Sequence, residues 1–187
     1  FMVTFTLPYQ LRALARQQPK ALYQLMFQVS SALLKDFAAR EGKGNLGFTS
    51  VLHTHNRKRE LHPHLHIVVP SGRYDAAKQQ WHKGDTRYLF NALSLAKVLR
   101  ARMMEAINHH AKLTLPSDIP SKWVVDCRKV GFGLSSLQYL SRYLYRGVLP
   151  DKDIISITDE AVTFRYKEGG TNITKTRTLP ILKFLWL

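Results

Sequence analysis

Three histidines alternate along one short stretch of the chain, residues 61–70, and this pattern constrains the fold most. His62, His64 and His66 occupy every second position. Successive side chains of a β-strand point to opposite faces, so the three imidazoles would share one face. The positions between and after them carry aliphatic side chains, namely Leu65, Ile67 and Val69. The stretch therefore predicts a strand that packs into a core on one face and presents histidines on the other.

A row of imidazoles suggests chemistry as well as structure. Imidazole binds borderline metal ions and titrates near neutral pH. A single histidine here would be explained most simply as part of a half-exposed strand. Three histidines in register favour a metal site instead.

The net charge of the chain points to a polyanionic partner. Lys and Arg number 28 against 13 Asp and Glu, which gives a formal net charge of +15. Such an excess favours nucleic acid first and an anionic membrane second. No apolar run approaches the length of a membrane span, and no signal peptide is visible. The lone Cys127 excludes an internal disulfide and indicates a reducing compartment.

The periodicity of apolar residues predicts an α+β fold with a mainly antiparallel sheet and helices packed on it. We expect a single domain over residues 1–187, because no linker or repeat interrupts the pattern. A polar connection at 56–60 and a polar loop at 71–88 separate some of the elements, and Ser94 is expected to cap the second helix. Strands are expected at 2–7, 47–55, 61–70, 122–127, 153–158, 161–167 and 173–180, and helices at 20–40, 94–111 and 136–146.

The predicted helix at 136–146 carries a second group of reactive side chains. Its buried stripe would be formed by leucines, while Tyr139 and Tyr143, four residues apart, would stack on an adjoining face. Arg142 and Arg146 flank that face. Taken alone, this is also the pattern of an ordinary amphipathic helix with partly buried tyrosines and a solvated arginine edge.

The histidines and tyrosines together suggest a phosphoryl-transfer reaction. A phenol, with a pKa of about 10, is a poor nucleophile at neutral pH. It can attack phosphorus when a metal neutralises the phosphate and the phenol loses its proton. The product would be a phosphotyrosine, from which a DNA hydroxyl can reseal the strand.

Four strings of the sequence resemble a known family. His64-Leu65-His66 is similar to the His-hydrophobe-His motif of the HUH endonucleases. The two-tyrosine rolling-circle transposases of bacterial insertion sequences resemble the chain over VTFTLPYQLR (3–12), VLHTHNRKRELHPHLHIVVPSG (51–72), YLSRYLYRGV (139–148) and VTFRYKE (162–168). The resemblance implies an HUH fold, in which a central antiparallel sheet carries the histidines and a neighbouring helix carries the tyrosines. It further implies nicking and joining of single-stranded DNA at transposon ends in the bacterial cytoplasm, through a 5′-phosphotyrosine and a divalent ion, Mg²⁺ or Mn²⁺.

Carried over to this sequence, the resemblance makes His64 and His66 metal ligands and Tyr139 and Tyr143 nucleophiles. The third ligand stays open. The predicted hairpin brings His53 or His55 alongside the motif, and we rank His53 first, His62 second and Gln138 third. The candidates for DNA binding are basic residues beside the two motifs, namely Arg57, Lys58, Arg59, Arg142 and Arg146. A solvated turn explains the first three of them equally well.

Full-length members of this family carry a cysteine-rich zinc-binding segment before the catalytic region. That segment and the family's continuation after residue 187 are not in this sequence, so we expect a catalytic-domain piece of a longer protein.

Two other classes compete with the transposase. A zinc hydrolase would need acidic ligands close to His66, and none follows it. A non-catalytic module that only binds single-stranded DNA would use the same histidines and tyrosines for contacts.

Overall fold

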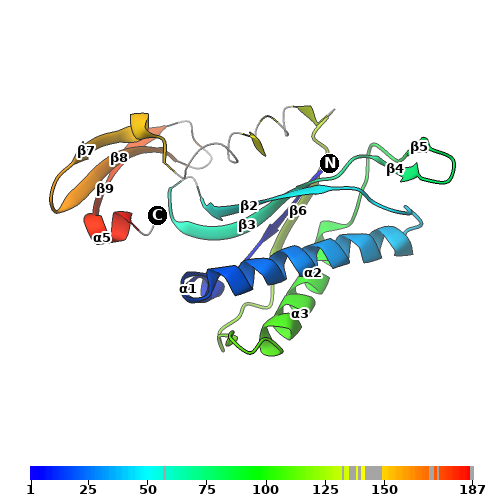
Figure 1. Cartoon of the computed structure of the whole chain (residues 1–187), viewed down its shortest axis with the longest axis horizontal. Helices are drawn as coiled ribbons and strands as arrows, with labels where there is room; N and C mark the ends of the chain where they lie inside the picture. Colours follow the sequence, from blue (N-terminus) through cyan, green and yellow to red (C-terminus); the bar gives the residue numbers. More distant parts are fainter. Residues whose placement is uncertain are drawn as a thin grey trace.

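A computed structural model describes residues 1–56, 58–131, 133–134, 138, 140–141, 149–168, 171 and 173–185. Figure 1 shows the course of the chain. The elements follow in this order: β1 (Met2–Thr6), η1 (Tyr9–Leu11), α1 (Arg12–Gln17), α2 (Pro19–Arg40), β2 (Thr49–His55), β3 (Leu61–Val68), β4 (Gly72–Asp75), β5 (Gln80–Lys83), α3 (Ala92–Asn108), β6 (Val124–Arg128), η2 (Asp151–Asp153), β7 (Ile154–Ile157), β8 (Ala161–Lys167), β9 (Thr174–Pro180) and α5 (Ile181–Phe184).

The centre of the fold is a four-stranded antiparallel sheet in the order β2-β3-β1-β6. The first strand of the chain lies between β3 and β6, so residues distant in sequence are paired here. Thr4 pairs with His66 on one side and with Asp126 on the other. The histidine-bearing β3 is an inner strand, which holds its backbone rigidly through hydrogen bonds on both edges.

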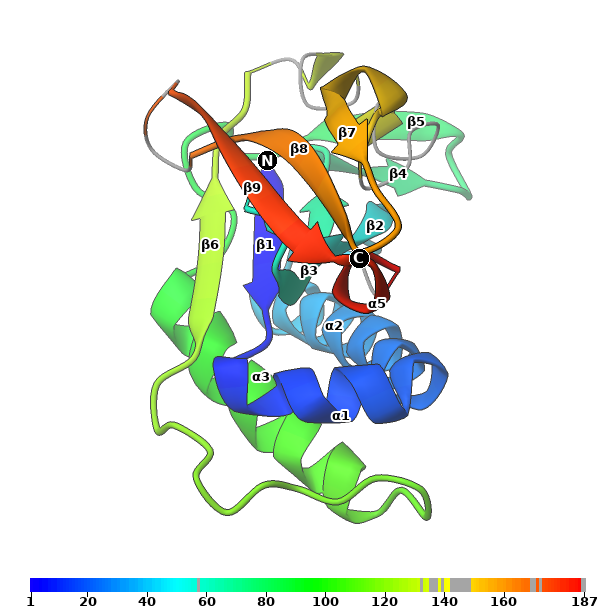
Figure 2. The same ribbon diagram turned by 90° about the vertical axis from the view of Figure 1, so that its left-hand side faces the viewer.

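Helices α2 and α3 cover one face of this sheet (Figures 1 and 2). Because side chains alternate along a strand, every second residue of β1 and β3 faces these helices. Val3, Phe5, Leu65 and Ile67 have no exposed surface and belong to the main hydrophobic core. The helices contribute fully or almost fully buried side chains to the same core, among them Leu22, Met26, Leu33, Leu34, Leu95, Leu99, Met103 and Ile107.

The opposite face of the sheet carries the histidines, as the alternating pattern predicts. Leu65 and Ile67 point to the helices, while His64 and His66 alternate with them in sequence and face the other way. The helix-covered face anchors the strands by apolar burial. Polar side chains can therefore occupy the second face without weakening the core.

Two smaller elements lie at opposite ends of the molecule (Figure 1). The β4–β5 hairpin projects at one end, and a three-stranded sheet, β7-β8-β9, lies with α5 at the other. Phe164 in β8 is fully buried and packs on Phe184 of α5, with their ring centroids 5.9 Å apart. This second sheet thus has a small apolar cluster of its own.

The structure confirms an α+β fold with an antiparallel sheet and helices, and it corrects several details. The region 71–88, expected as a loop, contains β4 and β5. These two strands form an antiparallel hairpin in which Tyr74 lies opposite Trp81. The strands expected at 153–158, 161–167 and 173–180 are present as β7, β8 and β9, and they form a sheet separate from the central one. The cap of α3 is Asn91, whose side chain accepts a hydrogen bond from the Ser94 amide; Ser94 itself is not the cap. Residues 9–17, for which no element was expected, form η1 and α1.

The predicted helix at 136–146 falls largely outside the described residues. Gln138, Leu140 and Ser141 are described and helical, and Leu140 is buried, as expected of the leucine stripe. Within the part of the chain that the structure describes, no helix is both long and apolar enough to cross a membrane.

Candidate metal centre

A tight turn between β2 and β3 sets the register that brings histidines of the two strands together. Asn56 closes this turn: its side-chain oxygen accepts hydrogen bonds from the amides of Lys58 (2.8 Å) and Glu60 (3.1 Å). Its side-chain amide also donates to the Glu60 carboxylate at 3.0 Å. With the turn fixed in this way, His53 pairs directly with His64.

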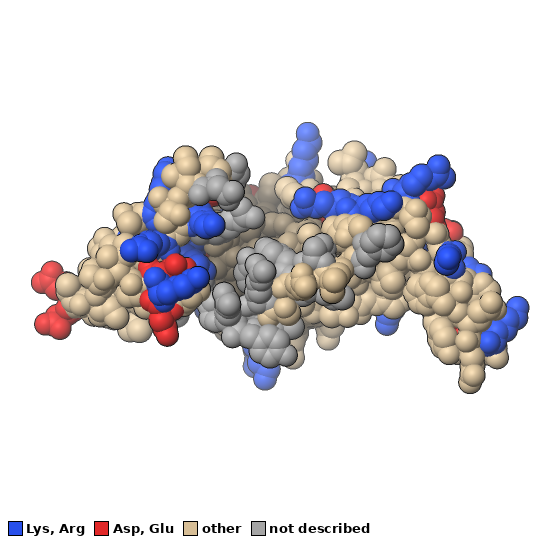
Figure 3. All heavy atoms as spheres, turned by 90° about the horizontal axis from the view of Figure 1, so that it is seen from above, with Lys and Arg blue, Asp and Glu red and all other residues tan. Residues whose placement is uncertain are grey.

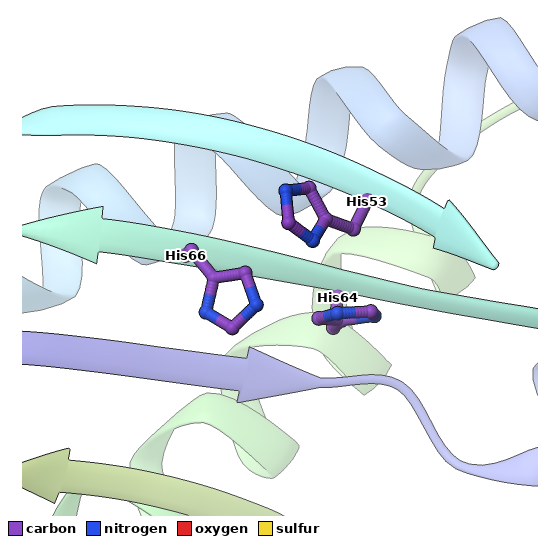
Figure 4. Close-up of side chains that lie close together, drawn as sticks. All are labelled: His53, His64 and His66. Carbon is purple, nitrogen blue, oxygen red and sulfur yellow. The ribbon is translucent and has the colours of Figure 1, made fainter. Parts of the chain in front are cut away.

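His53, His64 and His66 form a compact group on the face of the sheet away from α2 and α3 (Figure 4). One ring nitrogen from each residue lies within 4.8 Å of the corresponding nitrogens of the other two. The His53 ring centroid is 5.1 Å from that of His64 and 4.5 Å from that of His66. Three nitrogen donors at this separation can converge on one metal ion, because metal–nitrogen bonds of about 2 Å place neighbouring ligands roughly 3 to 4 Å apart.

Hydrogen bonds orient two of the three rings. The Nδ1 of His64 lies 2.6 Å from the backbone carbonyl oxygen of His62, so Nδ1 donates its proton there and the lone pair resides on Nε2. The Nδ1 of His66 lies 3.0 Å from the Thr4 hydroxyl on the neighbouring strand β1. Metal-binding histidines typically use one ring nitrogen for the metal and the other for such a partner. The donor set and its hydrogen bonds therefore fit a divalent metal.

Burial keeps these imidazoles uncharged. Desolvation is the main cause that lowers the pKa of His53 to about 4 and that of His66 to about 3, with a smaller contribution from the neighbouring histidines. Burial also lowers the pKa of His64, although its hydrogen bond to the His62 carbonyl acts in the opposite direction. At neutral pH the lone pairs are therefore available to a metal without loss of a proton.

The other candidates for a third ligand lie in different surroundings. The Nδ1 of His62 accepts a hydrogen bond from the Arg12 guanidinium at 3.1 Å, and its ring centroid is 5.5 Å from that of His64. His55 follows a register shift in β2, lies opposite Leu61 and contacts the Thr54 hydroxyl through Nδ1 at 2.9 Å. Gln138 is exposed, and its backbone carbonyl accepts a hydrogen bond from the Ser141 hydroxyl. The geometry thus groups His53 with the motif.

Across the described ranges, these histidines form the one group of three or more His, Cys, Asp or Glu side chains close enough to share a metal. The group holds no carboxylate, which distinguishes it from the acidic sites of many metal hydrolases. Burial also lowers the pKa of the nearby His55 to about 4, with smaller contributions from the positive charges of Arg59 and then Arg16.

Several predicted site residues lie outside the described part of the chain, namely Tyr139, Tyr143, Arg142, Arg146 and Arg57. Lys58 is exposed in the β2–β3 turn, and Arg59 follows it with a φ of 62°. Sequence reasoning missed Thr4 and Arg12, which contact His66 and His62. Both residues lie in the string at 3–12. A prediction that the first strand pairs with the histidine strand would have placed them near the motif.

The lowered histidine pKa values predict that the metal-free protein loses stability as the pH falls from about 6.5 toward 4. In the unfolded chain these histidines titrate near the ordinary value of 6.5, whereas His53 and His66 resist protonation in the folded state. Below pH 6.5 the unfolded state therefore binds more protons, which favours unfolding. The melting temperature, measured in EDTA between pH 7.5 and 4.5, should decrease across this interval.

A double variant, His53→Asn with His66→Asn, provides the comparison. Its melting temperature should vary less with pH than that of the unchanged protein, while the exposed-histidine variant His109→Asn should keep the original dependence. An identical decline in all three proteins would show that these two histidines do not resist protonation.

Comparisons with known proteins identify the family of this chain. The family model Y2_Tnp, described as "Putative transposase", matches residues 47–187. A curated protein of Sinorhizobium fredii (strain NBRC 101917 / NGR234), "Putative transposase y4qJ", is 29% identical over 191 residues, which cover 90% of this chain and 48% of that protein. The chain thus spans about half the length of this curated relative.

Among solved structures, a similar chain is the conjugative relaxase TrwC in complex with mutant OriT DNA. The TM-score is 0.48 at 19% identity, over 82% of this chain and 60% of the relaxase chain. The family assignment does not depend on this likeness, since the family model alone matches most of the chain. The chain therefore belongs to the Y2_Tnp family of transposases, which confirms the family indicated by the sequence motifs.

Proposed function

We propose that this chain is the catalytic domain of a transposase that nicks and rejoins single-stranded DNA through a 5′-phosphotyrosine. The observation that supports it most is the convergence of His53, His64 and His66 on one face of a rigid sheet, in a chain of a transposase family. We assign residues 1–187 to this single catalytic domain. Its proposed substrate is the single-stranded DNA at the ends of a bacterial transposon, which would be found in the nucleoid.

His53, His64 and His66 would hold one divalent ion. When bound, the ion supplies positive charge that neutralises the scissile phosphate. The contribution of the chain is to hold the three rings in place. The His62 carbonyl fixes the His64 ring, the Thr4 hydroxyl fixes the His66 ring, and burial keeps all three imidazoles neutral.

Tyr139 and Tyr143 would supply the nucleophile. A new bond forms between the tyrosine Oη and phosphorus, and the bond between phosphorus and the 3′-oxygen breaks. The phenol gives up its proton, and the departing 3′-oxygen gains one, so that a free 3′-hydroxyl results. In the rejoining step a DNA 3′-hydroxyl attacks the same phosphorus and releases the tyrosine, with the proton transfers reversed.

The charge of the molecule supports DNA as the partner. Lys and Arg dominate the charged surface on the face shown in Figure 3. A formal net charge of +15 over 187 residues favours a polyanion. Arg57, Lys58 and Arg59 in the β2–β3 turn, with Arg142 and Arg146 beside the tyrosines, remain our candidates for phosphate contacts next to the reaction centre.

A covalent adduct is the direct test of this function. Incubation of the full chain with a labelled single-stranded oligonucleotide and Mg²⁺ should give a protein–DNA species that survives boiling in detergent and disappears after protease treatment. A complex that forms in native gels but never survives denaturant would overturn the nicking function. It would favour instead a non-catalytic module that binds single-stranded DNA.

Metal exchange gives a further prediction. Mn²⁺ should support adduct formation at least as well as Mg²⁺ at equal concentration, because imidazole nitrogen suits Mn²⁺ better than Mg²⁺. Chelation with EDTA should abolish the adduct, and added Mn²⁺ should restore it. Measured in the denaturing gel assay, undiminished adduct in EDTA would remove the metal from the mechanism.

A further inference from the structure

A large basic cleft lies beside the histidine group. It has a volume of about 870 Å³, is open to solvent and is lined by three segments that are far apart in sequence. The first is η1 with α1, the second is the β2–β3 turn, and the third is β9 with α5. Its charged lining is formed by Arg12, Arg16, Arg59, Arg177, Lys183 and Glu60.

Among the described lining residues of this cleft, cations outnumber carboxylates. Five cations face a single carboxylate, Glu60, which already accepts a hydrogen bond from the Asn56 side chain at 3.0 Å. Among the described residues, no carboxylate lies within ion-pair distance of Arg12, Arg16 or Lys183. Cations held together in this way repel one another, so an anionic ligand would stabilise the arrangement.

Arg59 reaches the cleft from a strained backbone. Its φ is 62°, in the left-handed region, which costs a residue with a side chain more free energy than it costs glycine. The turn holds this conformation through a hydrogen bond from the Arg59 amide to the Asn56 carbonyl at 3.0 Å. The turn therefore fixes the backbone from which Arg59 enters the lining of the cleft.

The cleft connects with the histidine group through Arg12. Its guanidinium donates to His62 at 3.1 Å, and the His62 ring lies 5.5 Å from the His64 ring between their centroids. The same guanidinium lies over the ring of Tyr9, 4.8 Å from the ring centroid. Tyr9 is 71% exposed, so its ring is accessible for contact with an unpaired base.

We propose that this cleft binds a stretch of single-stranded DNA backbone next to the phosphate that is cleaved, with arginines on the phosphates and Tyr9 against a base. The proposal rests on the proposed function for the identity of the strand. It adds a DNA-binding surface built from α1, the β2–β3 turn and β9. Of the basic residues that line this surface, only Arg59 was expected from the sequence to bind DNA.

Binding measured without catalysis tests this surface. Fluorescence anisotropy of a labelled 20-nucleotide single strand, titrated with the full chain in EDTA, gives the affinity at several salt concentrations. Arg16→Gln and Arg177→Gln should each weaken binding about tenfold at 150 mM salt. Each should also reduce the slope of log affinity against log salt by about 0.7 for every phosphate that the variant no longer neutralises. Lys97→Gln removes one exposed cation from α3 and should change neither quantity.

Arg59→Gly separates binding from stability. Glycine adopts the left-handed backbone without strain, so the variant should stay folded, which its melting curve checks, while the affinity for the single strand should fall. Arg59→Lys should keep most of the affinity, because it retains the charge. An affinity unchanged by Arg16→Gln, Arg177→Gln and Arg59→Gly would overturn the proposal. The same loss in Lys97→Gln would also overturn it, since the effect would then be one of net charge.

Two further outcomes separate this proposal from the proposed function. If the unchanged protein forms the covalent adduct but the cleft variants bind normally, the cleft assignment is wrong and the nicking function stands. If the protein forms no adduct and the cleft variants still bind more weakly, the cleft is a DNA-binding surface and the nicking function is wrong. A larger loss of affinity for duplex than for single-stranded DNA would overturn the assignment to a single strand.

Discussion

His64→Ala is expected to reduce adduct formation on a single-stranded substrate by about a thousandfold or more, because metal stabilisation of developing phosphate charge contributes several kcal/mol. His64 lies beside both His53 and His66 and would donate through Nε2, its Nδ1 being engaged by the His62 carbonyl. DNA binding should remain largely intact, since the phosphate contacts that we propose are made by Lys and Arg side chains and not by His64. The adduct gel and the anisotropy assay measure the two effects separately.

The matched control is His109→Ala, which removes an exposed histidine at the end of α3. It should leave adduct formation unchanged. A melting curve of His64→Ala shows whether the variant is folded, and direct Mn²⁺ titration shows whether the metal still binds. Full nicking by His64→Ala, or an equal loss in His109→Ala, would contradict a role for His64 in holding the metal.

The same assay distinguishes the candidates for the third ligand. His53→Ala should lose about as much activity and Mn²⁺ affinity as His64→Ala. His62→Ala should lose less, because the His62 Nδ1 is occupied by Arg12 and its ring lies outside the three-histidine group. If His62→Ala abolishes Mn²⁺ binding while His53→Ala retains it, the ligand set must be reassigned.

The two faces of the central sheet were predictable because strand geometry alone determines them. Alternation in residues 61–70 separates His64 and His66 from Leu65 and Ile67, whatever the rest of the chain does. The spacing of apolar residues likewise predicts the long helix at 20–40, observed at Pro19–Arg40. These features depend on local periodicity, which a single sequence contains.

The membership of the histidine group was less predictable, because it depends on the register between two strands. His53 and His55 are separated by a register shift, and only His53 lies opposite His64. That register depends on how Asn56 closes the turn through hydrogen bonds to Lys58 and Glu60, which no periodicity reveals. The sequence therefore left His53, His55, His62 and Gln138 as alternatives.

Features built from distant segments escaped sequence reasoning altogether. Arg12, Arg59 and Arg177 belong to three different segments and line one cleft only in the folded chain. The β4–β5 hairpin was missed because its strands are only four residues each and mostly polar or exposed. The cleft depends on long-range packing, whereas the hairpin is a local pairing of β4 with β5 that leaves only a weak pattern in the sequence.

The two tyrosines are expected to differ in function. If residues 136–146 are helical, Tyr139 and Tyr143 lie on one face about 6 Å apart along the axis, at 1.5 Å per residue. One metal site can then serve only one phenol at a time, so the two should act in sequence. We assign the first nick to Tyr139, and the second strand or the reverse step to Tyr143.

Tyr139→Phe should reduce the adduct on a simple single-stranded substrate to background, because phenylalanine has no nucleophilic oxygen. Tyr143→Phe should keep part of the adduct but fail to complete strand exchange between a donor and an acceptor oligonucleotide. Tyr145→Phe is the matched control and should be nearly neutral, since in the helix expected from the sequence position 145 would project to a different side from position 139. If Tyr139→Phe and Tyr143→Phe both keep full adduct while Tyr145→Phe loses it, the assignment of the nucleophiles is wrong. If Tyr139 and Tyr143 merely exchange their effects, the phosphotyrosine chemistry stands and only the order of use changes.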